Sequence, residues 1–263
     1  AAGRFYSGSK DGLLKQIEGL VTKNAAKEDV IACVLPHAGY QYSGPVAGET
    51  VCRINIKDKI ILLGPNHTGD GSEFSISTQG CWETPLGQVK IDSTLAKAIL
   101  KESKFLKEDT LAHLGEHSLE VELPFLQYFR DDFQIVPIAF MSDNYKALKD
   151  IGAAIAEAIK KMGIEDSTLI VASSDMTHYE PQAQAEEKDK EAIKAILELN
   201  EDRLIEKVKQ LDISMCGYAP VAAMLAAAKE LGAKAAKLIK YQTSGDITGD
   251  KESVVGYAGI TIF

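Results

Sequence analysis

Several residue types are scarce in this sequence, and each scarcity narrows the class of protein. The 263 residues include only four cysteines, Cys33, Cys52, Cys81 and Cys216, and no two of them form a C-x-x-C pair. A disulfide-stapled secreted domain needs a denser framework, so we expect reduced thiols. The longest apolar runs, such as 30–35 and 59–63, fall far short of the roughly 20 residues that span a bilayer. The sequence therefore predicts no transmembrane helix.

Positive charge is also in short supply. Lys and Arg total 29 against 38 Asp and Glu, which gives a net charge of -9. Phosphate backbones and anionic lipid surfaces repel such a chain, so nucleic acid and membrane partners are not expected. The N-terminus has no basic segment followed by an apolar one, which favours a cytoplasmic location.

The remaining composition is that of an ordinary globular protein. Hydrophobic residues make up 45% and charged residues 25% of the chain, enough apolar material for a sizeable core. The sequence contains no internal repeat and no Pro/Ser-rich linker. We therefore expect a single domain over residues 1–263.

The hydrophobic pattern predicts a layered α/β/α fold around a central sheet that is mostly parallel or mixed. Short runs rich in Val, Ile and Leu predict buried strands at 30–35, 59–63, 134–140 and 168–172. Helical periodicity predicts helices at 13–21, 45–53, 93–101, 119–128, 147–162, 182–199, 201–211 and 220–231. Residues 74–91 resemble an antiparallel insertion or edge hairpin, and two closing strands at 236–242 and 255–263 are expected to pair.

Polar residues that suit metal binding follow the ends of these strands. His37 comes directly after the first buried strand and His67 after the second, whereas Asp175 and His178 follow a third and Asp246 follows a fourth. In open α/β sheets, ligands gather outside the carboxyl ends of the strands. We therefore expect these residues to share one crevice, although they lie far apart in the sequence.

The residue types in that crevice suggest a metal centre. Two imidazoles and one carboxylate form the ligand set typical of a ferrous ion with open positions, and His37, His67 and Asp246 fit this set. The same ligand types also hold catalytic zinc with a bound water. We predict Fe(II) as the cofactor, with Zn or Cu as alternatives.

Other polar residues could move protons beside that metal. His178 is free to act as a general acid or base, and Asp175 either orients it or serves as an alternative ligand. Glu116 and His117 lie in G-E-H-S-L-E at the start of a predicted helix, from which a polar side chain could reach the same crevice. We assign all four residues to the catalytic set. His113 is a weaker candidate, because it lies in a loop away from any strand end.

Each of these residues also has a purely structural interpretation. A histidine after a strand is more often a hydrogen-bonded loop residue than a ligand, and Asp175 and Asp246 could simply stabilise turns. Cys216 is better explained as a buried structural cysteine than as an activated thiol. Several aromatic residues could either line the pocket or pack in the core: Tyr40, Tyr42 and Trp82.

The chain resembles a known family in seven ordered motifs. The strings PHAGYQYSG, LLGPNHTG, WETPLG, GEHSLEVELPF, SSDMTHY, MCGYAP and YQTSGD resemble the motifs of the Memo family, from about Arg4 to the C-terminus. The family is similar in fold to class III extradiol dioxygenases, which bind ferrous iron with two histidines and a carboxylate. The resemblance implies that His37, His67 and Asp246 bind the metal and that His178 is the acid/base. Prokaryotic members are often named protein B of the AmmeMemoRadiSam system, which implies a functional link to a radical SAM protein.

Three functions remain open from the sequence. The first is a non-haem iron oxidoreductase of dioxygenase type, in which His178 moves a proton as dioxygen reacts. The second is a metal-dependent hydrolase, in which zinc activates a water and His178 or Glu116 handles the protons. The third is a non-catalytic adaptor that binds a metal or a peptide. The ligand itself, a small molecule or a peptide, is not identified by the sequence, and retained proton-transfer groups favour the enzyme.

Overall fold

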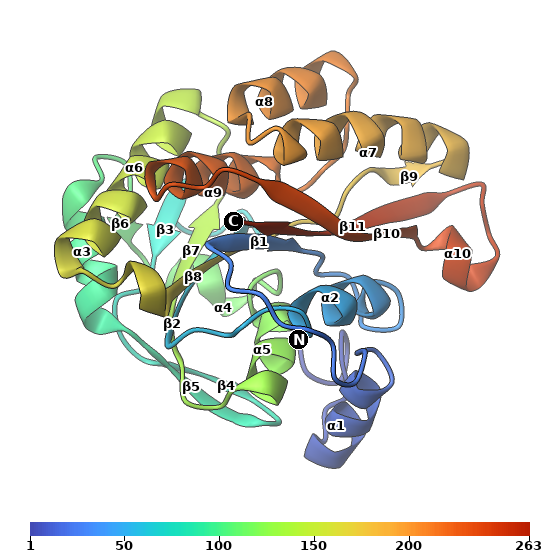
Figure 1. Cartoon of the computed structure of the whole chain (residues 1–263), viewed down its shortest axis with the longest axis horizontal. Coiled ribbons are helices and arrows are strands. Elements are labelled where there is room, and N and C mark those ends of the chain that lie inside the picture. The colour runs from blue at the N-terminus through green and yellow to red at the C-terminus, as the bar shows by residue number, and fades with distance from the viewer.

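The computed structural model describes residues 1–263 and consists of a mixed sheet covered by helices (Figure 1). The strands are β1 (Ala32–Leu35), β2 (Lys59–Pro65), β3 (Phe74–Ile76), β4 (Cys81–Thr84), β5 (Gly87–Ile91), β6 (Lys107–Glu108), β7 (Gln134–Phe140), β8 (Thr168–Ser173), β9 (His178–Glu180), β10 (Ala236–Thr243) and β11 (Val254–Ile262). The helices are α1 (Lys10–Glu18), α2 (Gly44–Val51), α3 (Ser93–Glu102), α4 (Leu111–Leu114), η1 (Glu120–Glu122), α5 (Leu123–Phe129), α6 (Tyr145–Met162), η2 (Glu165–Ser167), α7 (Gln182–Leu197), α8 (Glu201–Gln210), α9 (Tyr218–Glu230) and α10 (Gly245–Thr248).

Four parallel strands form the centre of the sheet. β1, β8, β2 and β7 are adjacent in that order and run in the same direction. β11 joins β1 antiparallel on one side, and β3 joins β7 antiparallel on the other. The expected sheet is thus confirmed in its mixed form, with a parallel centre and antiparallel flanks.

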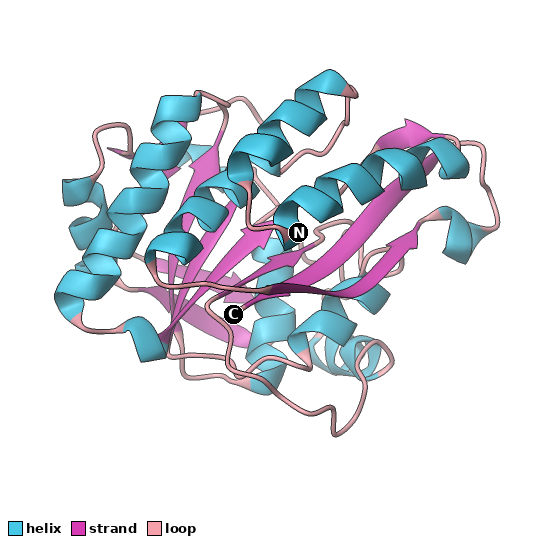
Figure 2. Cartoon of the chain, turned by 45° about the horizontal axis from the view of Figure 1, so that its top comes forward, coloured by secondary structure: helices cyan, strands magenta, loops and turns pink.

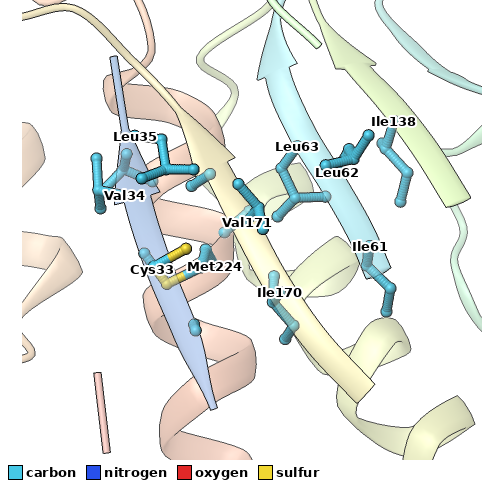
Figure 3. Close-up of a cluster of buried hydrophobic side chains, with 14 of the residues drawn as sticks. Cys33, Val34, Leu35, Ile61, Leu62, Leu63, Ile138, Ile170, Val171 and Met224 are labelled. Atoms are coloured by element: carbon cyan, nitrogen blue, oxygen red, sulfur yellow. The ribbon is translucent and has the colours of Figure 1, made fainter. Parts of the chain in front are cut away.

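The central strands are apolar because both of their faces are covered. Every residue of β1 and β8 is buried, and so is every residue of β2 and β7 after the first. Figure 3 shows their Val, Ile and Leu side chains on neighbouring strands, with Met224 of α9 beside Cys33. Parallel strands buried on both faces give continuous hydrophobic runs rather than alternation, which is why these four segments could be predicted.

Helices cover both faces of the sheet (Figure 2). α3, α6, α9, α8 and α7 pack in sequence over one face, and α1, α2 and α5 lie on the other (Figure 1). α6 has clear boundary signals, because the Asn144 side chain accepts hydrogen bonds from the first turn and Gly163 ends the helix with φ of 64°. This arrangement confirms the layered α/β/α prediction. None of the helices is both long and apolar enough to cross a membrane.

The structure contains both strand pairings that the sequence predicted outside the parallel centre, and it contains one short strand that was not predicted. β4 and β5 form the antiparallel hairpin anticipated within 74–91, and β10 pairs with β11 as predicted. The short strand β9 was not expected from the sequence. It pairs with β11 antiparallel and thereby fixes His178 at the edge of the sheet near the carboxyl end of β8.

Candidate metal centre

The carboxyl ends of three strands meet at one cavity. His37 follows β1, His67 follows β2, and Asp175 and His178 follow β8. All four residues line the same cavity of about 690 Å³. The structure therefore brings these sequence-distant residues together at the strand ends, where ligands of open α/β sheets gather.

Two histidines and a cysteine form a compact group of metal-type donors. One donor atom each from His37, His67 and Cys216 lies within 4.8 Å of the others, and Cys216 Sγ is 3.3 Å from His37 Nε2. Cys216 comes from the loop between α8 and α9. A Cβ on the next residue, Gly217, would lie only 2.3 Å from the Ser173 carbonyl oxygen, so glycine lets this loop approach the end of β8.

His37 is the deepest member of the group. It is 2% exposed, and its backbone N–H donates to Asp175 Oδ1 at 2.9 Å. Its ring Nδ1 lies 2.8 Å from Ser173 Oγ, which leaves Nε2 facing Cys216. Burial and the neighbouring histidines hold the pKa of His37 well below its usual range. The ring is therefore neutral, as a metal-binding imidazole must be.

His67 is held by Glu116. The carboxylate accepts from the backbone N–H of His67, His117 and Ser118, and it lies 3.0 Å from His67 Nδ1. Burial opposes ionisation of Glu116, but these hydrogen bonds prevail and lower its pKa to about 2. The same carboxylate raises the pKa of His67. Glu116 thus orients a candidate ligand, which differs from the direct catalytic role expected from the sequence.

His117 adds a third imidazole to this wall. Its ring stacks on that of His67 with 4.9 Å between centroids, and on Phe5 with 4.3 Å. Burial, partly offset by Glu116, lowers the pKa of His117. His67, Glu116 and His117 form a second group whose donor atoms lie within 4.8 Å. Glu116 already accepts several hydrogen bonds, so the group is best explained as support for His67.

His178 lines the same cavity in a defined orientation. Its backbone N–H donates to Ser214 Oγ at 2.7 Å, and its ring Nδ1 is 2.8 Å from the Ser214 carbonyl oxygen. A carbonyl only accepts, so Nδ1 carries a hydrogen, and the lone pair of the neutral ring is on Nε2. Such a ring can accept a proton at Nε2, the function of a general base.

Asp175 is buried beneath these residues. It is 5% exposed, and burial raises its pKa, an effect that the nearby His178 and the His37 backbone N–H oppose. Because its side chain bonds the His37 backbone, it positions the residue after β1. This contact connects the ends of β1 and β8. Asp175 does not form the hydrogen bond to the His178 ring that the sequence led us to expect.

Asp246 lies outside the group of His37, His67 and Cys216, in contrast to the ligand set expected from the sequence. Its exposed side chain accepts from the backbone N–H and hydroxyl of Thr243 and from Gln182 Nε2. The carboxylate stabilises the turn at the start of α10, which is the structural interpretation of this residue. Cys216 instead lies beside His37 and His67 as the third metal-type donor, a neighbourhood that the sequence did not predict.

The remaining candidates divide between the pocket and other regions. Tyr42 lines the same cavity as His37 and His67, whereas Tyr40 is a core residue stacked on Phe125. His113 and Trp82 line a separate cavity of about 300 Å³, where their ring centroids are 5.8 Å apart. His113 therefore lies outside the group formed by His37, His67 and Cys216.

Sequence reasoning missed the residues that hold the histidine rings in place. Ser173, Ser214 and Glu122 are such residues, and each contacts a ring or a group next to one. Two of them carried a weak signal. Ser173 ends an apolar strand with a polar residue, and Glu122 lies between the apolar Val121 and Leu123 just before α5. A buried position that stays polar often supports a functional group.

Comparisons with known proteins find similarity to one protein family over nearly the whole chain. The profile of the family described as Memo-like protein matches residues 1–261. A MEMO1 family protein of Methanothermobacter thermautotrophicus is 42% identical over 272 residues, which cover 99% of this chain and 98% of that protein. A MEMO1 family protein of Methanococcoides burtonii is 44% identical over 266 residues, with 99% and 97% covered.

One solved structure also matches. It is described as the uncharacterized protein JW3007 from Escherichia coli, with a TM-score of 0.57 and 12% sequence identity. The match covers 88% of this chain and 98% of that one. At this identity the likeness concerns the fold alone, and it agrees with the layered α/β architecture.

Proposed function

Since the chain belongs to the Memo family, we propose that it is a metal-dependent oxidoreductase whose metal ion is bound by His37, His67 and Cys216. The observation that carries this proposal is the convergence of these three donors, two of which, His37 and His67, line the cavity that also holds His178. A metal site and a proton-accepting group then share one solvent-accessible space. This combination suits an enzyme better than a structural metal site, which is normally closed.

The three donor residues fit a metal ion. His37 and His67 each have Nδ1 engaged by a neighbour, so the other ring nitrogen is free to bind. Burial, strengthened by Asp175, raises the pKa of the Cys216 thiol in the metal-free protein. Metal binding would therefore release a proton from Cys216, as thiolate ligation requires.

A cysteine in place of a carboxylate as the third ligand changes which metal the site would prefer. A carboxylate with two histidines suits Fe(II), whereas a thiolate is a softer ligand that also suits Cu(I) and Zn. We propose a redox-active metal, with iron first and copper as its competitor. When bound, such an ion would supply one-electron chemistry or activate dioxygen.

The protein residues would position the substrate and move protons. His178 Nε2 would take a proton from a bound substrate, and the Ser214 carbonyl would stabilise the resulting imidazolium. His117 lines the same cavity and would also contact substrate. The rings of several aromatic residues line the same cavity and would pack against a small molecule or a short peptide side chain: Phe5, Tyr42, Tyr179 and Tyr257.

A zinc-dependent hydrolase is the second candidate, and Cys216 is the observation that favours it. Two histidines and a cysteine are common zinc ligands, and zinc with an open position lowers the pKa of a bound water. His178 would then accept a proton from that water. This alternative needs no dioxygen. The link to a radical SAM protein and the cytoplasmic location stay predictions from the sequence.

Metal binding and dioxygen uptake test the proposal together. Metal-free protein receives Fe(II), Cu(I) and Zn(II) in competition under anaerobic conditions, and bound metal is measured for wild type, His37→Ala, Cys216→Ala and Asp246→Ala. We expect one metal per chain in wild type and Asp246→Ala, and a loss in the other two. Dioxygen uptake by the iron or copper form with a catechol-like probe would support the oxidoreductase.

Three outcomes would redirect the assignment. Preferred zinc binding, with hydrolysis of an ester probe and no dioxygen uptake, favours the hydrolase. Metal binding that survives Cys216→Ala but fails in Asp246→Ala would restore the carboxylate ligand expected from the sequence. Absence of metal binding in wild type would contradict the proposal and favour an adaptor.

A further inference from the structure

Glu122 is a fully buried carboxyl beneath the candidate metal centre, and the proposed function gives it no role. Its side chain is 0% exposed. One oxygen, Oε1, lies 2.7 Å from Ser173 Oγ, and the other has no hydrogen-bond partner. An ionised carboxylate in such a place normally has a cationic partner, and Glu122 has none among the ion pairs and hydrogen bonds of the structure.

The Ser173 hydroxyl connects Glu122 to the metal centre. Its Oγ lies 2.8 Å from His37 Nδ1, 2.8 Å from the Ser118 carbonyl oxygen and 2.7 Å from Glu122 Oε1. All of these groups are buried. A hydroxyl offers one hydrogen and accepts two hydrogen bonds. Three short contacts are satisfied only if one neighbour accepts and the other two donate.

The identity of the neighbours decides which of them donates. The Ser118 carbonyl can only accept, so it takes the Ser173 hydrogen. His37 Nδ1 and Glu122 Oε1 must then both donate to Ser173 Oγ. An ionised Glu122 could not donate, and it would leave two acceptor oxygens in contact at hydrogen-bond distance without a hydrogen between them. The contacts therefore require a hydrogen on Glu122.

We propose that Glu122 is a neutral carboxylic acid in the folded protein and that it acts with Ser173 to hold His37 in the tautomer protonated on Nδ1. His37 Nε2 then keeps its lone pair. This nitrogen is 3.3 Å from Cys216 Sγ, whose thiol can donate to it in the metal-free protein. Glu122 and Ser173 are thus positioning residues that act through His37.

The electrostatic surroundings agree with this hydrogen-bond pattern. Burial and the negative charge of Asp175 raise the pKa of Glu122 well above its usual range, against the opposing effect of the Ser173 hydroxyl. A neutral Glu122 also places no additional negative charge beneath the metal position. An ionised carboxylate there would favour the more oxidised metal, so the neutral acid favours Fe(II) or Cu(I). This last consequence rests on the proposed function.

The metal-free wild-type protein provides the first test, because it depends on no metal and no variant. Infrared spectra of protein with and without carbon-13-labelled glutamate, recorded near neutral pH, should contain a protonated carboxylic acid band that shifts on labelling. Glutamate labelling separates Glu122 from the buried Asp175. Long-range proton–nitrogen spectra of the five histidine rings should place the hydrogen of His37 on Nδ1. Absence of the labelled acid band, or a hydrogen on Nε2, would overturn the inference.

Two variants separate the roles of the residues. Glu122→Gln keeps a neutral group that can donate to Ser173, so the His37 tautomer and the metal affinity should stay close to wild type while the infrared band disappears. Ser173→Ala removes the acceptor of His37 Nδ1 and should weaken metal binding about 10–100-fold, with both His37 tautomers populated. Equal losses in both variants would contradict a neutral Glu122.

The tests also distinguish this inference from the proposed function. If wild type binds no metal but shows the labelled acid band and the Nδ1 tautomer, the proposed function fails and the assignment of Glu122 stands. If wild type binds metal but Glu122 is ionised, the assignment of Glu122 fails and the proposed function stands. Should Ser173→Ala fail to fold, the wild-type spectra and Glu122→Gln still decide the question.

Discussion

The two histidines of the donor group are held in opposite ways. The His67 side chain is 35% exposed, and it rests on Glu116, an ionised carboxylate with a pKa of about 2. His37 is 2% exposed, and it rests on the Ser173 hydroxyl, with Glu122 below it. One ring therefore contacts a charged group directly, and the other contacts a neutral hydroxyl.

The number of available N–H donors explains the difference. Glu116 lies where the chain turns before η1, so the backbone N–H groups of His117 and Ser118 point at its oxygens, and the N–H of His67 adds a third donor that stabilises the negative charge. Glu122 has only one hydroxyl beside it, and one of its oxygens has no partner. A buried carboxyl stays ionised only if enough donors or cations replace water. The donors around each carboxyl, rather than its residue type, therefore set the direction of its pKa shift.

Loss of the Glu116 carboxylate is expected to have the largest effect. Glu116→Ala leaves three backbone N–H groups and the His67 ring without their acceptor, and each unsatisfied buried donor costs about 1–3 kcal/mol. We expect the free energy of unfolding to fall by roughly 3 kcal/mol or more in urea titrations. Glu83→Ala removes an exposed glutamate and is the matched control. A loss below about 1 kcal/mol would contradict the assigned role of Glu116.

The pH dependence of stability should carry opposite signs for the two carboxyls. The pKa of Glu116 is lowered from 4.5 to about 2, so in this interval the unfolded state binds more protons. The stabilisation from Glu116 is therefore present above about pH 4.5 and is lost as the pH falls toward about 2. Glu116→Gln should flatten the acid limb of the stability profile of the metal-free protein. An unchanged acid limb would be inconsistent with a lowered pKa.

Glu122 should behave in the reverse manner. Its pKa is raised well above 4.5 in the folded protein, so above that pH the folded state binds more protons than the unfolded state. Its contribution to stability therefore falls as the pH rises from 4.5 toward the folded pKa. Glu122→Gln should gain stability relative to wild type over this range, measured by urea titrations at several pH values. A relative loss with rising pH would indicate an ionised Glu122.

The smallest effect is expected at the histidine that lacks any such support. Both ring nitrogens of His113 are buried without a hydrogen-bond partner, and burial lowers its pKa to about 4. His113→Phe replaces unsatisfied polar atoms with apolar ones and should change the free energy of unfolding by less than about 1 kcal/mol. Metal affinity should stay at the wild-type value. A large loss of stability or of metal affinity would mean that the His113 ring forms a hydrogen bond or binds a ligand in solution.

The fold and the pocket could largely be predicted from the sequence. The runs at β2, β7 and β8 are continuous and apolar because parallel central strands are buried on both faces. His37 and His67 follow such runs directly, so their convergence at the strand ends followed from a general rule of α/β sheets. The strand β9 is too short to show a pattern, and it was missed.

The third donor could not be predicted in the same way. Cys216 lies in a loop between two helices, where no periodic pattern indicates direction. It approaches His37 because α9 packs against the sheet and because Gly217 tolerates contact with the end of β8. Asp246 had the expected residue type in a loop after a strand, but Thr243 and Gln182 occupy its oxygens.

The sequence by itself determined the layered fold, the family and the positions of the two histidines, because these depend on local hydrophobic pattern and on strand ends. Only the tertiary structure decided which third donor meets them and which carboxyl carries a charge. Both of these depend on short contacts between distant segments, such as Cys216 with His37 and Glu122 with Ser173. The pKa of a buried group is set by the donors that replace water around it, and a linear pattern does not record them.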